Sequence, residues 1–357
     1  DNTEGYVCAT VPQTGPAGIG FISMLGWGNA VTILPEMMYR QFGDEEALPR
    51  QYESMKLFVE AEIRKMWKKN LWIGPSLGDW LAMGKGIAWQ AMHNNPVSNA
   101  FIVHDLKVIS ETAERLGKRE DAARYRRQLA ATTDAYIKKF VSKNGIVAKD
   151  YQSAYIMALK YVLPEGELRE RVRKNFVANI RKNGLQTGFF ATEHLLPLLV
   201  EAGEQKLAYD VLLQENCPGW MYQVKCGATT TWERWDALKP DGTVNEEKMA
   251  GSGENMVSFN HYAFGSVGEF YYQYILGIRP EKPGFAKLHF APYPDERLGG
   301  VSGSYLSVAG KIESAWRYEP DGCHIRLATP VEAVVLLPDG RSENVPAGTY
   351  EWTVKRP

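Results

Sequence analysis

The sequence predicts an α + β protein in two parts: a helical toroid followed by a small antiparallel β-sandwich. The prediction rests on a change of hydrophobic period. Residues 1–278 repeat their apolar side chains every three or four positions, as on one face of a helix. Residues 279–357 alternate apolar and polar side chains, as in half-buried strands. Pro280, Pro283 and Gly284 stand at the change and end the helical part.

Each helix is predicted from its own apolar face. The face of the first long helix is formed by Tyr52, Met55, Val59, Ile63 and Met66. A helix over 102–116 stops at Gly117, and another runs over 122–140. So short a link makes the two an antiparallel αα-hairpin. Further helices are expected at 28–42, 151–162, 165–183, 189–203, 205–215 and 255–278. Eight or nine helices in hairpin pairs indicate an α/α toroid.

The strands of the second part are separated by turn residues. Short strands are expected at 287–290, 304–308, 324–327 and 333–337. Between them lie Gly299-Gly300, Pro320-Asp321-Gly322 and Pro338-Asp339-Gly340, which favour tight turns.

Composition excludes several classes of function. The 357 residues include 41 basic and 42 acidic side chains, a net charge of −1. This balance argues against a nucleic-acid binder and a polybasic membrane surface. No apolar run reaches the ~18 residues of a membrane span. The chain starts at Asp1 without a leader, so we expect a mature or truncated product whose location the sequence leaves open.

Cysteine and histidine spacing predicts neither disulfides nor metal. The chain has no CxxC pair, and we expect free, mostly buried thiols at Cys8, Cys217, Cys226 and Cys323. A disulfide between Cys217 and Cys226 is the alternative. Six histidines without HxH or HExxH spacing argue against zinc, and no cofactor is expected.

The densest candidate for chemistry is the segment 227–236. In it Glu233 stands between Trp232 and Trp235, beside a guanidinium. Apolar walls raise the pKa of a carboxyl group and an arginine lowers it, so this side chain suits general acid–base catalysis. The alternative is a structural Glu-Arg ion pair flanked by core tryptophans.

Three further segments mix aromatic and polar side chains. In 258–266, which resembles a helix start, His261 is either a hydroxyl partner or a satisfied core histidine. In Gly78-Asp79-Trp80, the acid either binds a hydroxyl or caps a helix. In 26–30, Trp27 between two glycines is either a pocket wall or a packing plug.

Together these segments indicate a site for a neutral polyhydroxylated ligand. Tryptophan faces, hydroxyl partners and an activated glutamate are the groups such a ligand needs. The phosphate loop GxxxxGK[ST], the dinucleotide loop GxGxxG and the GxSxG elbow are all missing. A carbohydrate-active enzyme is the reading that remains.

The same segments resemble the α-L-rhamnosidases of glycoside hydrolase family 78. The similar segments are 26–35 (GWGDA-hydrophobic-P), 78–80 (GDW), 227–236 (GATT-x-WERWD, the most specific) and 258–266 (SxNHYAFGS). Thr187-Gly188-Phe189 and Pro218-Gly219-Trp220 add support, and the similarity extends over nearly the whole chain.

The resemblance implies an (α/α)6 barrel followed by a C-terminal β-sandwich, and inverting hydrolysis of terminal α-L-rhamnose. It makes Glu233 the general base that activates water. It places Trp27, Trp80 and His261 against the rhamnose. The remaining substrate-binding candidates are Asn29, Asp79, Trp232 and Trp235. Rhamnose-containing glycosides are the expected partners.

Two departures from the family pattern matter. The family carries its general acid in an Asp/Arg-rich segment before a Gly-Trp-x-Gly-Asp, whereas here Ser23-Met24 precede Leu25-Gly26-Trp27. We therefore expect the acid and the first barrel helices to lie upstream of this chain, which alone would be inactive. The second departure is Asn29, where the family usually has Asp; an amide keeps the hydrogen bonds without the charge.

Two other readings stay open. The chain could be a degenerate relative that binds sugar without cleaving it, or a different (α/α)6 glycosidase of the trehalase-like or debranching kind. The WERWD and NHYAFGS segments argue against the latter.

Overall fold

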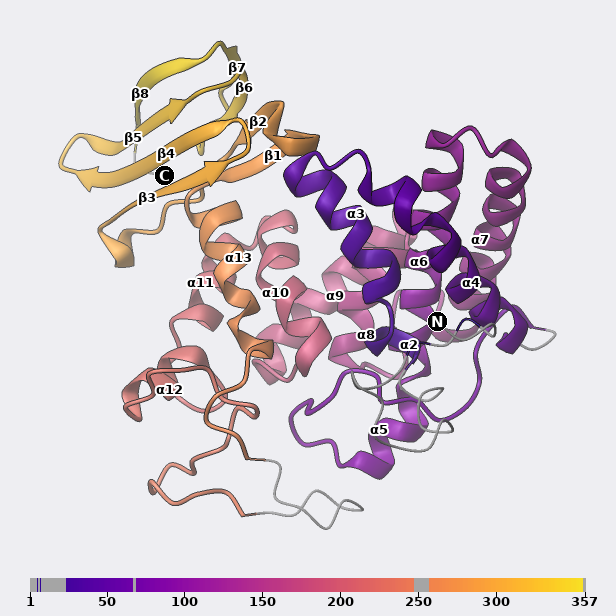
Figure 1. The fold of residues 1–357 in the computed structure, drawn as a ribbon. Coiled ribbons are helices and arrows are strands. Elements are labelled where there is room, and N and C mark those ends of the chain that lie inside the picture. Colours follow the sequence, from indigo (N-terminus) through magenta and orange to yellow (C-terminus); the bar gives the residue numbers. More distant parts are fainter. Residues whose placement is uncertain (1–4, 6, 8–23, 67–68, 247–256, 356–357) are drawn as a thin grey trace. The chain divides into compact units, whose positions relative to one another are not determined.

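The computed structural model describes residues 5, 7, 24–66, 69–246 and 257–355 (Figure 1). Their contacts group into two units. The first contains Asp1–Ile33 with Gln51–Gly265, and the second contains Leu34–Arg50 with Ser266–Pro357. The predicted domain boundary after residue 278 stays a prediction.

The first unit is helical, and the chain crosses between the units within α3 (Ala30–Phe42) and α4 (Ala47–Lys65). Its other elements are α2 (Met24–Trp27), α5 (Ile87–His93), α6 (Asn95–Arg115), α7 (Arg119–Phe140), α8 (Gln152–Met157), η1 (Ala158–Val162), α9 (Glu167–Asn183), α10 (Phe189–Glu201), α11 (Gln205–Leu212) and α12 (Trp220–Lys225). The expected helices at 28–42, 151–162, 165–183, 189–203 and 205–215 are present, and each differs from its predicted range at one end, by one to three residues.

The predicted hairpin of α6 and α7 turns at the predicted glycine. Gly117 has φ +71°, and its N–H donates to Glu114 O at 3.0 Å. The N–H of Lys118 donates to Ala113 O at 2.8 Å. These are the two bonds of a Schellman motif, which needs a left-handed residue at this position.

The core of this hairpin contains the predicted apolar face of α4. Tyr52, Met55 and Val59 are each at most 1% exposed, and they pack with Ile102 and Leu106 of α6. The spacing of apolar residues therefore located this part of the core correctly.

The predicted helix over 255–278 is wrong at its start. Among the described residues the helical part begins with η2 (Ala263–Ser266) and continues through α13 (Val267–Phe270) and η3 (Tyr271–Ile275). Ser258 O and His261 N instead pair with the backbone of Glu233 and Thr231, so this backbone is not available for a helix. Residues 247–256 lie outside the described part.

The second unit contains two four-stranded sheets. One has the order β1-β2-β6-β7 and the other β3-β4-β5-β8. The strands are β1 (Ile278–Lys282), β2 (Lys287–Phe290), β3 (Gly300–Ser307), β4 (Gly310–Glu319), β5 (Gly322–Thr329), β6 (Ala333–Leu336), β7 (Ser342–Val345) and β8 (Gly348–Val354). All these pairings are antiparallel except β2 with β6. Short 3-10 turns lie at η4 (Pro283–Phe285) and η5 (Glu296–Leu298).

Residues 34–50 belong to the second unit through specific contacts. Gln41 Nε2 donates to Tyr305 Oη of β3 at 2.7 Å. Gly43 lies so close to Gly284 that an added Cβ would stand 3.2 Å from its Cα. The unit is therefore built from two stretches that are distant in sequence.

The cysteine prediction is only partly correct. Cys217, Cys226 and Cys323 are free thiols, so the alternative disulfide is not formed. Cys226 is exposed and not buried, because it ends α12 at the surface. Cys8 lies outside the described residues.

No helix among the described residues has the length and apolar character that crossing a membrane requires. No group of three or more His, Cys, Asp or Glu side chains in the same residues could hold a metal ion.

Candidate active site

Glu233 lies in an irregular segment that pairs with a second loop. Glu233 N donates to Ser258 O at 2.8 Å, and His261 N donates to Thr231 O at 2.9 Å. The carboxylate Oε2 accepts from Ser258 N at 3.0 Å, and the side chain stays partly exposed. A backbone donor thus fixes one oxygen of a carboxylate that solvent can reach.

The neighbouring cation pairs with an aspartate. Arg234 Nε donates to Asp236 Oδ1 at 2.6 Å, and its Nη2 donates to Oδ2 at 3.0 Å. Asn245 Nδ2 donates to the same Oδ2 at 2.9 Å. This bidentate geometry balances the guanidinium charge beside Glu233.

The two tryptophans of this segment are buried. Trp232 is 2% exposed, with Tyr222 and Phe259 against its ring. Trp235 is fully buried and stacks on Phe264 at 3.9 Å between centroids. Its Nε1 donates to a backbone oxygen of the 187–188 loop at 2.9 Å. Both rings therefore lie beneath the surface, although the sequence placed them against substrate.

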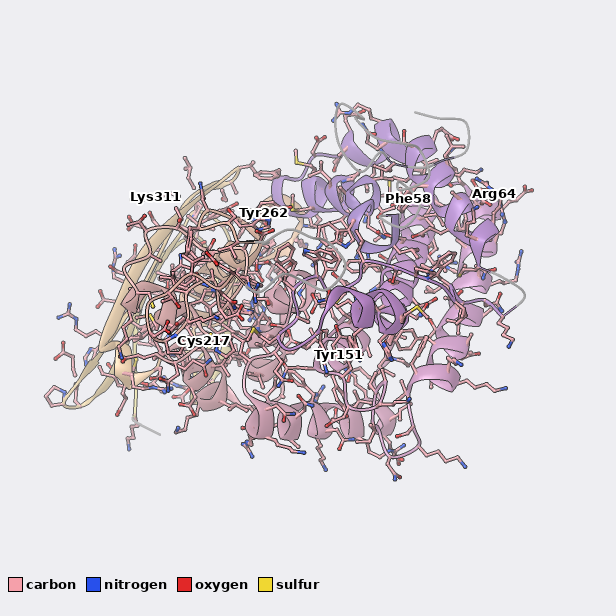
Figure 2. All side chains as sticks on the ribbon, turned by 90° about the horizontal axis from the view of Figure 1, so that it is seen from below. Phe58, Arg64, Tyr151, Cys217, Tyr262 and Lys311 are labelled. Carbon is pink, nitrogen blue, oxygen red and sulfur yellow. The ribbon has the colours of Figure 1, made fainter. Side chains whose placement is uncertain are left out.

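His261 is partly exposed and has a defined tautomer. Its Nδ1 accepts from Ala263 N at 3.3 Å, so the neutral ring carries its proton on Nε2. One face is stacked on Tyr262, which is 85% exposed. Tyr262 is labelled in Figure 2. The Phe189 ring lies 4.8 Å away, centroid to centroid. Nε2–H is thus a donor for a hydroxyl group.

Trp27 lies near the start of α10 and is partly exposed. The Trp27 ring centroid is 6.0 Å from that of Phe189 and 5.1 Å from that of Phe190. Its Nε1 donates to Gly78 O at 3.2 Å, which fixes the indole to the loop of Trp80. The ring combines the two roles that the sequence left open, packing against its neighbours and keeping a partly exposed face.

Phe189 is the residue that sequence reasoning missed. Its ring contacts those of both Trp27 and His261, and its N–H donates to Trp80 O at 3.0 Å. The side chain is partly exposed. The signal that could have found it is the Thr187-Gly188-Phe189 segment, which we used only as support for the resemblance.

Asp79 is a buried helix cap and does not reach the surface. It is 0% exposed; Oδ2 accepts from Gly188 N at 2.8 Å, and Oδ1 from Phe190 N at 2.7 Å and Ala191 N at 3.1 Å. Burial raises the pKa of this carboxyl, while the backbone donors act in the opposite direction. It caps α10, which is 109 positions further along the chain, and not a helix of its own.

Asn29 is likewise buried in a polar network. It accepts from Gly26 N at 2.6 Å and donates to Asp105 Oδ2. Thr32 Oγ1 donates to Asp105 Oδ1 at 2.5 Å. Burial and the nearby Asp105 raise the pKa of Glu62 well above its ordinary value. An aspartate at position 29 would add a third carboxyl here, so the amide avoids repulsion. Ser23, which we had compared with the family's acid segment, lies outside the described residues.

Comparisons with known proteins support the resemblance. Residues 1–275 match the model of the bacterial alpha-L-rhamnosidase 6 hairpin glycosidase domain, and 277–350 match that of the C-terminal domain. An alpha-L-rhamnosidase of Alteromonas sp. (strain LOR) is 34% identical over 85% of this chain and 33% of its own length. One from Streptomyces avermitilis is 31% identical over 96% of the chain and 32% of its length.

Solved structures agree with the same assignment. The Streptomyces avermitilis alpha-L-rhamnosidase complexed with L-rhamnose has a TM-score of 0.88 at 28% identity, over 99% of this chain and 35% of that one. The enzyme from Aspergillus terreus has a TM-score of 0.84 at 30% identity, over 92% and 39%. The chain spans about a third of the length of the curated relatives it matches. By its sequence and its fold, the chain belongs to the bacterial α-L-rhamnosidase six-hairpin glycosidase family.

Proposed function

We propose that the protein carrying this chain removes terminal α-L-rhamnose from glycosides, with inversion at the anomeric carbon. Family membership supports the reaction class. The observation that carries the site is the pairing of 231–233 with 258–261, which holds Glu233 and His261 on neighbouring loops. The alternatives of a structural ion pair and a satisfied core histidine fit less well, because both side chains keep exposed surface.

In this mechanism Glu233 is the general base. It takes a proton from a water molecule as the water oxygen attacks the anomeric carbon from the face opposite the leaving group. Ser258 N–H holds one carboxylate oxygen and so fixes its direction. A second carboxyl group protonates the glycosidic oxygen as the C–O bond breaks, ~6.5–9.5 Å from the first.

We propose that this general acid comes from a part of the enzyme outside these 357 residues. Three buried acids of the helical core face other parts of the core: Asp79 binds the start of α10, Asp105 binds Asn29 and Thr32, and Glu62 lies beside Asp105. Relatives about three times as long leave room for another segment.

The sugar itself is proposed to lie against Trp27, Trp80 and Phe189. Their partly exposed rings offer an apolar surface for a pyranose face and for the 6-methyl group of rhamnose. His261 Nε2–H donates to a hydroxyl group. We propose a supporting role for Asn29, Asp79, Trp232 and Trp235, because burial leaves their side chains no contact surface.

The test is turnover of an aryl α-L-rhamnoside by this chain with and without its native upstream residues. We expect turnover only in the longer form, and in it Glu233→Gln should lower kcat by about 10²–10⁴-fold. NMR of the first sugar released reports inversion. Glu215→Gln, an exposed acid on the same unit, is the matched control.

Three results would contradict the proposal. Near-normal turnover by Glu233→Gln would remove Glu233 as the base. Full activity of the 357-residue chain alone would place the acid inside it. Rhamnose binding without turnover in the longer form would identify a degenerate, non-catalytic relative.

A further inference from the structure

A groove of about 880 Å³ lies on the helical unit, apart from Glu233. Three stretches line it: the region of α5 from Lys85 to Pro96, the loop and helix ends over 138–152, and Gln186. Tyr151, labelled in Figure 2, is one of its wall residues. Neither the sequence motifs nor the proposed mechanism uses this groove.

The groove is strongly basic in an otherwise neutral chain. Lys85, Lys138, Lys139 and Lys149 line it, against the single acid Asp150. Within the described ranges, none of these four lysines forms an ion pair. Since the whole chain carries a net charge of −1, this excess is local and favours an anion.

An aromatic platform lies among these cations. Trp89 is partly exposed and stacks on His93 with 4.5 Å between centroids. Lys85 Nζ stands 4.5 Å from the Trp89 ring centroid, and Tyr151 meets the ring edge-on. A flat ring beside ammonium groups suits a sugar ring that carries an anionic substituent.

The loop that carries Lys149 is held in an unfavourable backbone conformation. Ala148, Lys149 and Asp150 have φ of 45°, 58° and 72°, values that residues other than glycine rarely adopt. Asn179 Nδ2 donates to Asp150 O at 3.1 Å, and Tyr155 Oη to Asp150 Oδ1 at 2.9 Å. Such conformations persist only where surrounding contacts impose them, and they gather at functional sites.

The groove wall is bonded to the loop that carries Trp80. Tyr151 Oη donates to Asn94 Oδ1 at 3.1 Å, and Asn94 Nδ2 donates to Leu77 O at 2.9 Å. A second groove residue, Gln186, is also bonded to this loop: its backbone oxygen accepts from Met83 N at 3.2 Å. Hydrogen bonds thus join the groove wall to the loop whose Trp80 we proposed as part of the rhamnose surface.

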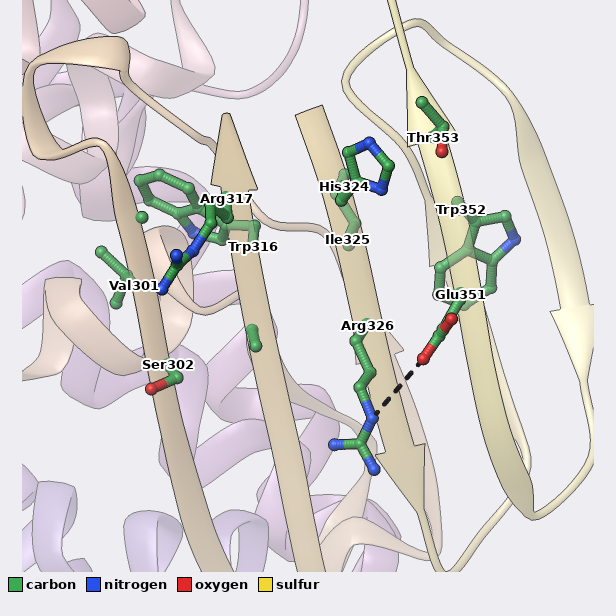
Figure 3. Close-up of a pocket in the computed structure, with 12 residues that line it drawn as sticks. Val301, Ser302, Trp316, Arg317, His324, Ile325, Arg326, Glu351, Trp352 and Thr353 are labelled. Atoms are coloured by element: carbon green, nitrogen blue, oxygen red, sulfur yellow. Dashed lines mark ion pairs between the residues drawn. The ribbon is translucent and has the colours of Figure 1, made fainter. Parts of the chain in front are cut away.

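A second hollow, on the sheet β3-β4-β5-β8, has a different charge arrangement (Figure 3). Its Arg326 reaches Glu351 at 4.0 Å and Glu313 at 3.6 Å, and His324 binds Asp321 at 2.8 Å. Arg326, His324 and Glu351 thus have partners within the protein. Arg317 adds one further cation, so the hollow offers an anion fewer cations than the four lysines of the groove do.

We propose that the lysine groove binds an anionic sugar residue of the substrate, linked through the glycosidic oxygen to the rhamnose. The anionic group is a carboxylate or a sulfate, both of which lysine ammonium groups attract. The proposal rests on the proposed function for the position of the rhamnose. The groove makes the enzyme prefer rhamnose on acidic glycans over rhamnose on neutral ones.

The test uses S-linked disaccharides, which are not hydrolysed, so that binding is measured without turnover. The three ligands are an α-L-rhamnosyl uronic acid, its uncharged methyl ester and a rhamnosyl sugar with one sulfate. All measurements use the longer form with its native upstream residues. Calorimetry at low salt compares this unmodified protein with the variant K138Q/K139Q/K149Q. The matched control, K174Q/K182Q/K282Q, removes three exposed lysines that do not line the groove.

The groove variant should lose about tenfold in affinity for the acidic ligand, and the loss should shrink as salt is added. Affinity for the methyl ester, and turnover of the neutral aryl rhamnoside, should stay unchanged. The sulfate arm decides between the two anionic groups. Equal affinity for acid and ester, or an equal loss in the control variant, would overturn the proposal. Failure of the proposed function differs, because the unmodified longer form, which carries the native upstream residues, would then not turn over the neutral aryl rhamnoside.

Discussion

Glu233 and Asp79 are both acids next to tryptophans, yet the structure gives them opposite positions. Glu233 is partly exposed, on a loop that pairs with another loop, and one backbone N–H holds it. Asp79 is fully buried, and three backbone N–H groups at the start of α10 surround it. The two carboxyl groups thus differ in burial and in the number of backbone donors that hold them, although both have tryptophan neighbours in sequence.

The tryptophans divide in the same way. Trp27 and Trp80 keep exposed surface, whereas Trp232 and Trp235 have almost none. The short sequence motifs therefore supply residues to two layers, an exposed layer of loops and a buried layer beneath it. Substitutions in the buried layer should change stability, and substitutions in the exposed layer should change ligand binding.

Trp235→Ala should have the largest effect on stability. It empties a fully buried site that stacks on Phe264, and should lower the free energy of unfolding by about 3–5 kcal/mol. Urea unfolding measures the change. Tyr262→Ala, at an 85% exposed ring, is the control and should cost less than about 0.5 kcal/mol. Equal stability of the two variants would break the division into layers.

Asp79→Asn should come next, at about 1–3 kcal/mol of lost stability. The amide nitrogen cannot accept, so one of the N–H groups of Gly188, Phe190 and Ala191 loses its partner in a buried place. Asp241→Asn makes the same chemical change in an exposed turn and should cost much less. Thermal melts of both variants check this difference. A stable Asp79→Asn protein that no longer binds rhamnose would assign Asp79 to the exposed layer instead.

His261→Ala should weaken rhamnose binding about tenfold, the loss of a hydrogen bond of ~1.4 kcal/mol. The free energy of unfolding should change by less than about 1 kcal/mol, because the ring is partly exposed. Calorimetric titration with rhamnose, beside a denaturation curve, separates the two effects. A large loss of stability with unchanged affinity would make His261 a core residue.

Glu62→Gln should change stability little near pH 4.5, where the native carboxyl is protonated, and should have a clear effect on the pH dependence above it. The folded pKa of Glu62 lies well above its ordinary 4.5, so the folded state keeps a proton that the unfolded chain releases. Stability therefore falls as pH rises from about 4.5 toward the folded pKa. The amide does not titrate, and unfolding curves across this range should show a shallower fall. If the free energy of unfolding fell with pH as steeply in Glu62→Gln as in the unmodified protein, Glu62 would not be the group that binds this proton.

Local patterns predicted the parts of the fold that local forces decide. The apolar period located the face of α4, and a single glycine located the end of α6. The helix start at Ser258 failed because its backbone pairs with Glu233, 25 positions earlier, and the spacing of apolar residues does not report such pairing. The sequence also left open which helix Asp79 caps, and it did not single out Phe189, since the partners of both residues come from distant segments.

The hydrogen bond between Gln41 and Tyr305 joins residues that are 264 positions apart in the chain. During synthesis, residues 34–50 leave the ribosome long before the strands they contact exist. At ~5–20 residues per second they wait on the order of ten seconds or more for those strands. Over that interval the exposed Leu34 and Met37 lack the sheet unit to which their segment belongs, and a chaperone has time to bind them.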